Sequence, residues 1–434
     1  MSKKSGRRVV VTGIGEVTPL NPGAQEKTAW ESMKQGKSGI GYITKLDHTT
    51  FPVHTAGEIK NFKLQEDLKK KLGDLEPYLY DCGRFLLSAA YKALQDAQLH
   101  PEHEDPSGIG AIVGISGNDN HDLKGDRLLD YYLRMKGKGA PGNHPGICSR
   151  HETHGFITRD NSNFVKILAE LFQLKGVVHT INTACAAGAQ SVGEAYHLIK
   201  YGIQEVMIVG GVDSLLDLVP ITGLGMLGSL SPAVTPDRAS RPFDAKRDGF
   251  VLSEGSSILV VEEMNRAMQR KAPIYGEIIG YGCSMNAFRL TELPPDGKRG
   301  KIALEKAIED ADIRLDQIDY INAHGTSTVQ NDVIETMILK EVFGDHIYNI
   351  PITANKSMMG HIISACGASE AINTLMSIKE QYICPTINYE DEDPRCDLDY
   401  TPNKGRHHTI NIGMSNSFGF GGQNAVLLFQ KVDF

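Results

Sequence analysis

Short apolar runs alternate along the chain with longer segments whose apolar residues recur at helical spacing. RRVVVTGIG (residues 7–15) and GIGAIVGIS (108–116) are near-continuous apolar runs, and DCGRFLLSAAYKALQDAQL (81–99), between them, has apolar residues every three or four positions. The first pattern predicts buried strands, and the second predicts an amphipathic helix. Their alternation predicts an α/β protein with buried, mostly parallel strands.

The second half of the chain repeats this rhythm from IYGEIIGYGCS (274–284) onward, and a weak internal match joins the halves. Residues 177–202 and 318–344 both read as strand, small-residue turn and helix, and both contain Ile-Asn before the turn. A duplicated chain would place Cys185 and His324 on related turns facing one cleft. A two-residue match also arises by coincidence, so both interpretations stay open at this point.

A polar helical stretch, VEEMNRAMQRKAP (261–273), separates the two halves. It predicts two units, 1–263 and 264–434. Between Ser116 and Gly176 the sequence is polar and loop-rich. Such a long irregular insertion is typical of a functional cap or a subunit contact rather than a core element.

Composition excludes several classes of function. The 434 residues are 41% apolar and 23% charged, as in ordinary soluble domains. A net charge of −8 disfavours nucleic-acid binding, which needs a basic surface. No segment approaches the ~20 apolar residues of a membrane span, and the N-terminus lacks the apolar core of a secretory signal, so we expect a cytoplasmic protein. Seven widely spaced cysteines without a CxxC pair argue against a disulfide framework or a zinc site.

Lys69, Lys70 and Lys71 form a local basic run in EDLKKKLGD. An acidic protein partner could dock on such a patch. The alternative is a solvated helix face, and the charge run by itself does not separate the two interpretations.

Cys185 stands among Ala and Gly residues in NTACAAGAQ (182–190), where a strand-like run turns into a helix-like one. A thiol at a helix start lies beside unpaired backbone N–H groups, which predicts a lowered pKa and a reactive thiolate. The same N–H groups could hold a developing oxyanion. For this residue alone, a small buried thiol in a tightly packed helix start stays the alternative.

His324 in NAHGTST and His361 in NKSMMGHIISACGASE each stand where an apolar or small-residue run meets a Gly-containing turn. Two such histidines and one cysteine make a nucleophile-and-base constellation, although each histidine alone reads as an ordinary hydrogen-bonded residue. Lys356 and Glu370 flank His361 in sequence. Buried together they would set the local field, whereas a surface ion pair is the default for a Lys and a Glu.

NSFGFGGQNA (416–425) is a Gly-rich turn with two aromatic residues that runs into the strand-like AVLLF. Its glycines would let backbone N–H groups approach a substrate, but the chain contains no GxxxxGK[ST] pattern. The segment therefore predicts an oxyanion or gating loop rather than a nucleotide site.

Seven motifs in one order now point to a family. They are RRVVVTGIGEVTPLN, NTACAAGA, ASRPFDAKRDGFVLSEG, INAHGTST, NKSMMGH, DLDYTPN and NSFGFGGQNA, and they cover nearly the whole chain. The chain resembles the elongating β-ketoacyl-acyl carrier protein synthases, the condensing enzymes of fatty-acid and type II polyketide assembly in the thiolase superfamily. The resemblance implies the thiolase fold, in which duplicated α/β halves form a five-layered αβαβα core, normally in a dimer.

By the same resemblance, Cys185 is the nucleophile that takes the acyl chain from an acyl-carrier-protein thioester. His324 and His361 bind the malonyl thioester carbonyl and promote decarboxylation. The amides of Cys185 and Phe420 form the oxyanion hole, and Phe420 is the gating aromatic. The family needs no metal and no enzyme-bound cofactor, because the phosphopantetheine belongs to the acyl carrier protein.

The resemblance also assigns supporting residues. Lys356 and Glu370 match the buried ion pair beside the histidines, and Thr326 and Thr328 match the threonines that hydrogen-bond the phosphopantetheine arm. The acidic positions after TST, Asp332 and Glu335, are expected to be structural.

Two hypotheses remain. The chain is an active condensing enzyme, as a homodimer or paired with a homologous chain-length factor, or it is a catalytically silent acyl-binding partner. Silent partners lose the nucleophile, so the intact set of catalytic motifs favours the enzyme. GFGGQN lacks the second cysteine of a biosynthetic thiolase, and the initiating synthases use Asn in place of one histidine.

The main departures from the family pattern lie in the first half. GISGNDNHD (114–122) replaces the family's turn with a bulky pocket-lining residue, and Gly117 falls near that position. A differently shaped acyl pocket is therefore expected. Residues 145–172 also match the housekeeping pattern poorly, which favours a specialised type II polyketide pathway over bulk fatty-acid elongation.

Overall fold

The computed structural model describes residues 6–23, 28–50, 52–117 and 161–433. Ten strands within these ranges form one continuous mixed sheet, to which each half of the chain contributes five. In the part of the chain described, no helix is both long and apolar enough to cross a membrane. The core is therefore built around a sheet, as the alternating pattern predicts. The expectation of mostly parallel strands is wrong, because five of the nine strand pairings in this sheet are antiparallel.

The first half contributes a five-stranded unit. Its strands are β1 (Val9–Val17), β4 (Ile109–Gly114), β5 (Val178–Ile181), β6 (Val206–Asp213) and β7 (Gly255–Glu263). They lie in the order β5-β4-β6-β7-β1. β4 runs parallel to β5 and β6, and β7 runs antiparallel to β6 and β1.

The second half repeats this arrangement. Its strands are β8 (Gly276–Met285), β9 (Tyr320–Asn322), β10 (Ile352–Thr353), β13 (Ile412–Phe418) and β14 (Gln423–Gln430). They lie in the order β10-β9-β13-β14-β8, with β9 parallel to β10 and β13, and β14 antiparallel to β13 and β8. β1 pairs with β8 and joins the halves. Taken in chain order, both halves place their strands identically, so the predicted duplication is confirmed.

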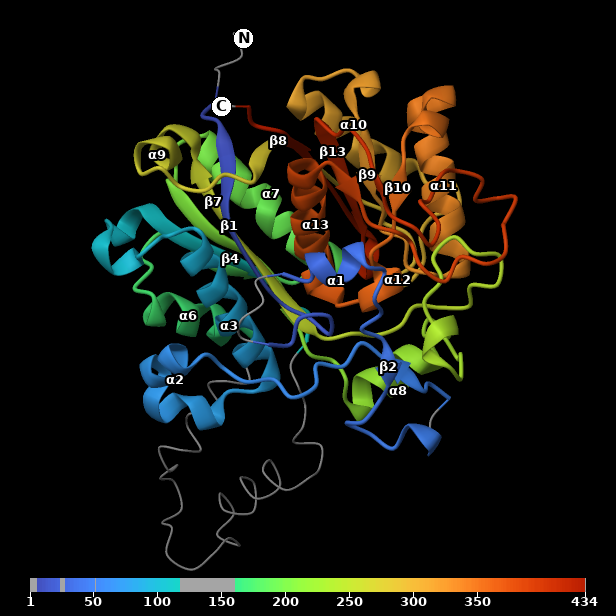
Figure 1. Cartoon of the computed structure of the whole chain (residues 1–434), viewed down its shortest axis with the longest axis horizontal. Coiled ribbons are helices and arrows are strands. Elements are labelled where there is room, and N and C mark those ends of the chain that lie inside the picture. Colours follow the sequence, from blue (N-terminus) through green and yellow to red (C-terminus); the bar gives the residue numbers. More distant parts are fainter. Residues whose placement is uncertain (1–5, 24–27, 51, 118–160, 434) are drawn as a thin grey trace, which may run out of the picture.

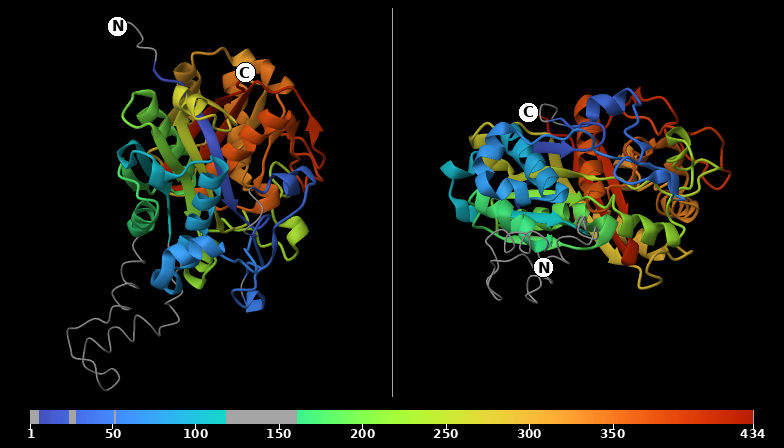
Figure 2. Two further views of the ribbon diagram at one scale, coloured as in Figure 1. Left: turned by 60° about the vertical axis from the view of Figure 1, so that its left-hand side comes forward. Right: turned by 90° about the horizontal axis from the view of Figure 1, so that it is seen from below.

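Helices fill the space between the half-sheets and cover their outer faces (Figures 1 and 2). The main ones are α3 (Asp81–Asp96), α6 (Asn161–Leu171), α7 (Ala187–Lys200), α10 (Lys298–Ala311), α11 (Val329–Phe343) and α13 (Cys366–Glu380). α7 and α13 contact each other and strands of both halves. α3 and α6 pack on the first half, and α10, with α11 beside it, packs on the second. These are the five predicted layers.

Shorter elements complete the fold. They are α1 (Trp30–Lys34), α2 (Glu66–Leu72), α8 (Leu218–Met226), α9 (Met264–Gln269), α12 (Lys356–Met359) and the strand pairs β2 (Gly41–Tyr42) with β3 (Thr55–Ala56) and β11 (Tyr382–Ile383) with β12 (Arg406–His407).

Alternate side chains of the central strands belong to different core clusters. In β6, Val206 and Ile208 pack in the cluster that contains α3, whereas Met207 and Val209 pack in the cluster that contains α7 and α13. Successive side chains of a strand point to opposite faces, so a sheet covered on both faces needs a continuous apolar run. The sequence shows this run.

Paired glycines repeat in the first strand of each half. A Cβ atom built at Gly13 or Gly15 of β1, or at Gly280 or Gly282 of β8, would lie 2.1–2.4 Å from a carbonyl oxygen of α3 or α10, respectively. No side chain fits at that distance, so these positions must be glycine for the helix to pack on the strand.

The internal match predicted from the sequence is out of register. The strand order makes β5 equivalent to β10, so the turn Ala184–Ala186 with Cys185 corresponds to Ile363–Ala365, before α13. Ser364 therefore occupies the position equivalent to Cys185. His324 follows β9, the equivalent of β4, and is not the counterpart of Cys185. Strand–turn–helix occurs twice in each half. The shared Ile-Asn therefore aligned the segment after β5 with the segment after β9, which is not its equivalent.

Two other expectations concern boundaries. The stretch predicted to be irregular, 116–176, contains a helix, since residues 161–171 form α6. The rest of that insertion, 118–160, lies outside the described residues. The division at 263/264 stays a prediction, because the sheet runs continuously from one half to the other.

Candidate functional site

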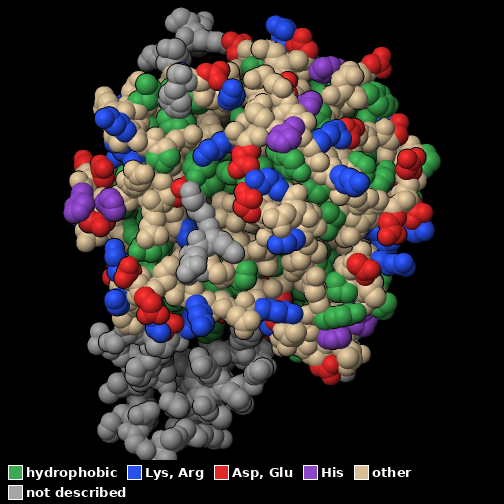
Figure 3. Space-filling model, in the orientation of Figure 1, with side chains coloured by type: hydrophobic (Ala, Val, Ile, Leu, Met, Phe, Trp, Pro, Cys, Tyr) green, Lys and Arg blue, Asp and Glu red, His purple; other side chains and the backbone are tan. Residues whose placement is uncertain are grey.

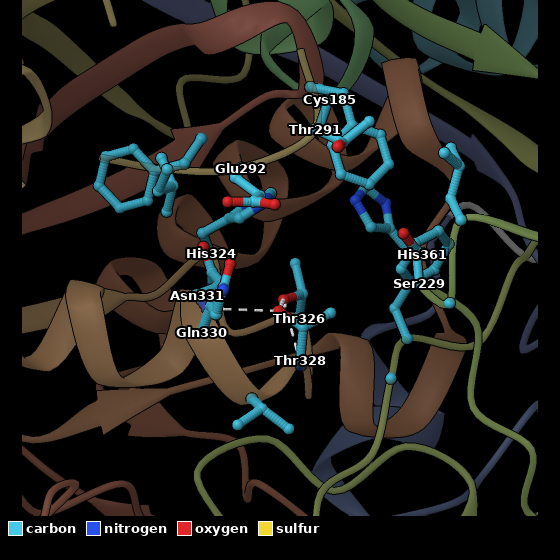
Figure 4. Close-up of a pocket in the computed structure, with 18 of the residues that line it drawn as sticks. Cys185, Ser229, Thr291, Glu292, His324, Thr326, Thr328, Gln330, Asn331 and His361 are labelled. Carbon is cyan, nitrogen blue, oxygen red and sulfur yellow. Dashed lines mark hydrogen bonds between the residues drawn. The ribbon is translucent and has the colours of Figure 1, made fainter. Parts of the chain in front are cut away.

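A cavity of about 290 Å³ opens where loops from both halves meet beyond the carboxyl ends of the parallel strands. Ligand sites of open α/β sheets form at this edge, because the connecting loops converge there. Its lining includes Cys185, Ser229, Asp248, Phe250, Thr291, Glu292, His324, Thr326, Thr328, Asn331, His361, Phe418 and Phe420. Figure 4 shows Cys185 at one end of this group and Thr326 and Thr328 at the other.

The structure brings together the three residues proposed for chemistry, which come from three separate loops. Cys185 Sγ and one ring nitrogen each of His324 and His361 lie within 4.8 Å of one another, and all three side chains are buried. A thiol and two imidazoles are also donors that zinc accepts. However, the Lys356 ammonium lies 3.3 Å from His324 Nδ1, and its positive charge opposes a cation there.

Cys185 lies in a strained turn between β5 and α7. Ala184 adopts φ +48°, a left-handed conformation that residues with a side chain rarely take. Its counterpart in the second half, Ile363, has φ +41°. The strain is therefore part of the duplicated scaffold, and it directs Cys185 into the cavity.

The predicted low pKa of Cys185 is wrong. Burial raises the pKa of this thiol to about 11, and backbone hydrogen bonds from Phe420 and Cys185 and the charge of Lys356 only partly oppose that rise. Desolvation disfavours the charged thiolate, because Cys185 is only 2% exposed, and this effect exceeds that of the helix start. Cys185 is therefore a protonated thiol.

The Phe420 loop lies beside Cys185. The backbone N–H groups of Phe420 and Cys185 both donate toward the thiol. These are the two amides predicted to form an oxyanion hole, and the structure places them at one point. The Phe420 ring lies 6.1 Å from that of Phe250.

His324 follows β9 and is held from both sides of its backbone. Its N–H donates to Glu335 Oε1 at 2.8 Å, and Lys356 Nζ donates to its carbonyl oxygen at 2.6 Å. Lys356 Nζ also lies 3.3 Å from Nδ1. An ammonium group can only donate, so Nδ1 is the acceptor and the ring proton lies on Nε2.

His361 is held by a bridge to the loop around Leu252. Its backbone N–H donates to Val251 O at 2.7 Å, and the Ile363 N–H donates to its Nδ1 at 3.0 Å. A backbone donor requires an unprotonated Nδ1, so the proton of His361 also lies on Nε2. The two imidazole rings lie 5.6 Å apart, nearly perpendicular.

Both histidines are neutral. Burial, followed by the positive charge of Lys356, holds the pKa of His324 and of His361 well below the ordinary value. Together with their tautomers, this makes the pair two N–H donors that carry no charge of their own. Such donors can stabilise negative charge that develops on a substrate oxygen.

Lys356 and Glu370 form a buried ion pair, as predicted from the sequence. Nζ donates to Glu370 Oε1, and both side chains are about 2% exposed. Burial lowers the pKa of Lys356, but Glu370 and the nearby sulfurs of Cys366 and Cys185 together raise it by more, so the net shift is upward. The ammonium therefore stays charged and orients His324.

Asp332 and Glu335, both on α11, hold backbone rather than line the cavity. Glu335 Oε2 accepts the Gly325 N–H at 2.9 Å in addition to the bond from His324, and Asp332 accepts the Phe243 N–H at 2.8 Å. Their contacts are those of supporting residues. Burial raises the pKa of Glu335 to about 7.

We expect this shift to make the stability of the protein fall as pH rises. The folded chain holds a proton on Glu335 that the unfolded chain has lost between about pH 4.5 and 7, so stability decreases through this window. Between pH 5 and 7.5 the wild type should lose about 2 kcal/mol of unfolding free energy relative to Glu335→Gln. Urea denaturation of both proteins across this range tests the effect; parallel curves would contradict it.

Thr326 and Thr328 lie at the end of the cavity away from Cys185 (Figure 4). Their hydroxyl oxygens are 2.9 Å apart, and Thr328 Oγ1 also accepts the Asn331 N–H at the start of α11. Two adjacent hydroxyl groups can bind an amide of an extended ligand. Their assignment to a phosphopantetheine arm stays a prediction.

Gly117 does not line the cavity. A Cβ atom there would lie 2.3 Å from Leu215 Cδ2, so Leu215 occupies the space that a side chain at residue 117 would take. Leu215 packs in the apolar cluster that contains Cys185 and Phe250. The expected difference in the shape of the acyl pocket stays a prediction.

Two residues that contact His361 were not singled out from the sequence: Phe250, which lines the cavity, and Cys366. Phe250 lies in the motif ASRPFDAKRDGFVLSEG, and its ring packs 5.1 Å from that of His361. Cys366 lies in NKSMMGHIISACGASE, with its sulfur 3.1 Å from His361 Nδ1. Both residues lie in motifs noted in the sequence, but the sequence could not show that they contact His361.

The basic run Lys69–Lys71 forms the exposed last turn of α2. Lys70 is 3.8 Å from Asp67, and Lys71 lies over the ring of Phe172 at 5.7 Å. Figure 3 shows acidic and basic side chains interspersed over the visible face. The docking hypothesis for Lys69–Lys71 stays a prediction.

Both halves of the chain match family models. Residues 6–267 match the model described as "Beta-ketoacyl synthase, N-terminal domain", and residues 275–390 match "Beta-ketoacyl synthase, C-terminal domain". The chain is 36% identical to 3-oxoacyl-[acyl-carrier-protein] synthase 2 of Synechocystis sp., over 99% of this chain and 100% of the relative. The protein of the same name from Staphylococcus aureus is also 36% identical, over 98% and 99%.

Solved structures show the same fold. A type II PKS ketosynthase in complex with its acyl-carrier protein (AntDE:AntF) is 34% identical with a TM-score of 0.82, over 99% of this chain and 100% of that one. The ishigamide ketosynthase/chain length factor is 28% identical with a TM-score of 0.85, over 99% and 100%. A β-ketoacyl synthase from Burkholderia phymatum is 30% identical with a TM-score of 0.85, over 98% and 100%.

Proposed function

The chain belongs to the β-ketoacyl synthase family of condensing acyltransferases, and from this premise we propose that it condenses a malonyl thioester with an acyl chain held on Cys185. The matches to the family models and to the two synthases confirm the family resemblance predicted from the sequence. The observation that carries the proposal is the convergence of one thiol and two neutral Nε2–H imidazoles on one buried cavity.

The first step is acyl transfer to Cys185. Its sulfur attacks the carbonyl of the incoming thioester, a C–S bond forms to the enzyme, and the C–S bond to the carrier breaks. The thiol proton of Cys185 ends on the departing thiolate, so no net proton is lost. The amides of Cys185 and Phe420 stabilise the tetrahedral oxyanion, which lets a protonated thiol react.

The second step is decarboxylation of the malonyl thioester. Its C–C bond to the carboxylate breaks, CO2 leaves, and the electron pair becomes an enolate. His324 and His361 donate from Nε2 to the enolate oxygen, and their low pKa values keep them neutral donors. Phe250 and Phe418 keep this part of the cavity apolar, which favours loss of a charged carboxylate as neutral CO2.

The third step joins the two carbon chains. The enolate carbon attacks the acyl carbonyl on Cys185, the tetrahedral intermediate expels the Cys185 thiolate, and one proton from solvent restores the thiol. No metal or redox cofactor enters this scheme. Both substrates arrive on the phosphopantetheine of an acyl carrier protein, whose arm would lie along Thr326 and Thr328.

For the pathway, we favour a specialised type II polyketide system over bulk fatty-acid elongation. This rests on the departures around Gly117 and residues 145–172 and on similarity to a type II PKS ketosynthase. A homologous chain-length factor is then the expected partner, as the ishigamide ketosynthase has in its solved structure. Copurification with the products of adjacent genes tests this, and a stable homodimer that elongates without a partner would contradict it.

A catalytically silent, acyl-binding subunit is the alternative function. Acyl transfer separates the two, because a silent subunit has no need of a reacting thiol. We expect incubation with acyl-carrier-protein thioester to add the acyl mass to the tryptic peptide that contains Cys185. The exposed Cys283 serves as the internal control for nonspecific reaction. Absence of acyl mass on Cys185, with intact thioester present, would overturn the proposed function.

A further inference from the structure

α13 begins at a cysteine whose sulfur touches one of the two histidines. Cys366 Sγ lies 3.1 Å from His361 Nδ1 and accepts the Ile362 N–H at 3.1 Å. The residue is 1% exposed. The acyl-transfer scheme makes no use of this thiol, although it contacts the ring that faces the substrate.

The direction of the Cys366–His361 hydrogen bond follows from the other donors. The Ile363 N–H already points at His361 Nδ1, so that nitrogen carries no proton. The Ile362 N–H donates a hydrogen bond to the sulfur of Cys366. Burial raises the pKa of Cys366, so the thiol keeps its own proton. The S–H group therefore donates to Nδ1, in a chain from Ile362 N–H through sulfur to the imidazole.

The same face of α13 supports the other histidine. Glu370 stands four residues after Cys366, one helical turn along, and such pairs lie on one face of a helix. Glu370 binds Lys356, and Lys356 contacts His324 Nδ1. One helix face thus supports Nδ1 of both rings, through the Glu370–Lys356 ion pair for His324 and through a thiol for His361.

We propose that Cys366 is a positioning residue, whose S–H group donates to Nδ1 of His361 and holds that ring with its Nε2–H directed at the malonyl thioester carbonyl. The proposal rests on the proposed function, since it concerns the decarboxylation step. Loss of the thiol leaves Ile363 as the donor to Nδ1, so the ring orients less strictly without leaving the site. Cys185 acylation does not depend on this contact.

Cys384 provides a matched control. It is also a buried cysteine, 1% exposed, and it packs in the same core cluster as Cys366. Cys384→Ala also removes one sulfur atom from this core, but it leaves the Cys366–His361 contact in place. A loss of decarboxylation rate that occurs in Cys366→Ala but not in Cys384→Ala is therefore due to the lost contact with His361, not to the space left by the missing sulfur.

The test compares two rates in the full-length protein: acyl transfer to Cys185 and conversion of malonyl- to acetyl-carrier protein, both followed by mass spectrometry. Cys366→Ala should lower kcat for decarboxylation roughly three- to tenfold, with KM and the acyl-transfer rate unchanged. Cys366→Ser, which keeps a donor, should recover most of the rate. Cys366→Val, which fills the volume without a donor, should match the alanine variant and stands in for it if that variant does not fold.

The outcomes separate this proposal from the proposed function. Equal decarboxylation rates in Cys366→Ala and Cys384→Ala would overturn the positioning role, and so would a Cys366→Ser variant no better than Cys366→Val. If the wild type neither takes up acyl groups nor decarboxylates, the proposed function itself fails.

Discussion

Glutamine in place of Cys185 is expected to abolish condensation while malonyl decarboxylation continues. Without the thiol no acyl-enzyme forms, and loss of a covalent nucleophile lowers turnover by roughly 10⁴-fold or more. The glutamine side chain has nearly the length of an acylated cysteine. Its carbonyl oxygen can therefore accept hydrogen bonds from the backbone N–H groups of residue 185 and Phe420. His324 and His361 are untouched, so the malonyl thioester still meets both donors.

The measurement follows elongated product and CO2 release from malonyl-carrier protein separately. Cys283→Ala, an exposed cysteine outside the cavity, is the control and should retain both activities. Loss of both activities in Cys185→Gln, with an unchanged melting temperature, would contradict the assignment of decarboxylation to the histidines.

Alanine at His324 or at His361 should give the opposite pattern, with acyl transfer retained and decarboxylation lost. Each ring supplies one N–H to the enolate oxygen in a buried site, and removing one such donor typically costs about 10²–10³-fold in rate. Neither ring is needed to balance protons in acyl transfer, because the Cys185 proton leaves with the carrier thiolate. Acylation of Cys185 should therefore stay within about tenfold of wild type.

Acylation is read from the mass of the Cys185 peptide, and decarboxylation from malonyl- to acetyl-carrier protein. His103→Ala, at an exposed histidine, controls for the loss of a ring. Decarboxylation by either alanine variant at the wild-type rate would contradict the two-donor scheme. Equal loss of acylation and decarboxylation would instead indicate that the histidine also activates the thiol.

Much of the fold could be predicted from the sequence. Near-continuous apolar runs such as β6 are required by a sheet that is covered on both faces, and they are visible without coordinates. The register of the duplication was not predictable in this way. Strand–turn–helix occurs twice in each half, and only the pairing of β5 with β4 and of β10 with β9 decides that Ser364, rather than His324, is the counterpart of Cys185.

The sequence by itself determined which residues to consider at the site. Cys185, His324, His361, Lys356 and Phe420 each stand in a motif of small residues and turns, and the structure brings all five to one cavity wall or its support. Residue type and motif order suffice for this choice because seven motifs match one enzyme family in order. The positive φ of Ala184, by contrast, is not indicated by its residue type.

Only the tertiary structure decided the protonation and hydrogen-bond state of these residues. Burial raises the pKa of Cys185 to about 11, which reverses the expectation drawn from a helix start alone. The Nε2–H tautomer of His324 comes from Lys356, 32 residues further along the chain, whereas that of His361 comes from the N–H of Ile363 in the same turn. Desolvation and the donor to His324 depend on groups distant in sequence, so a local pattern can name the residues but not their chemical state.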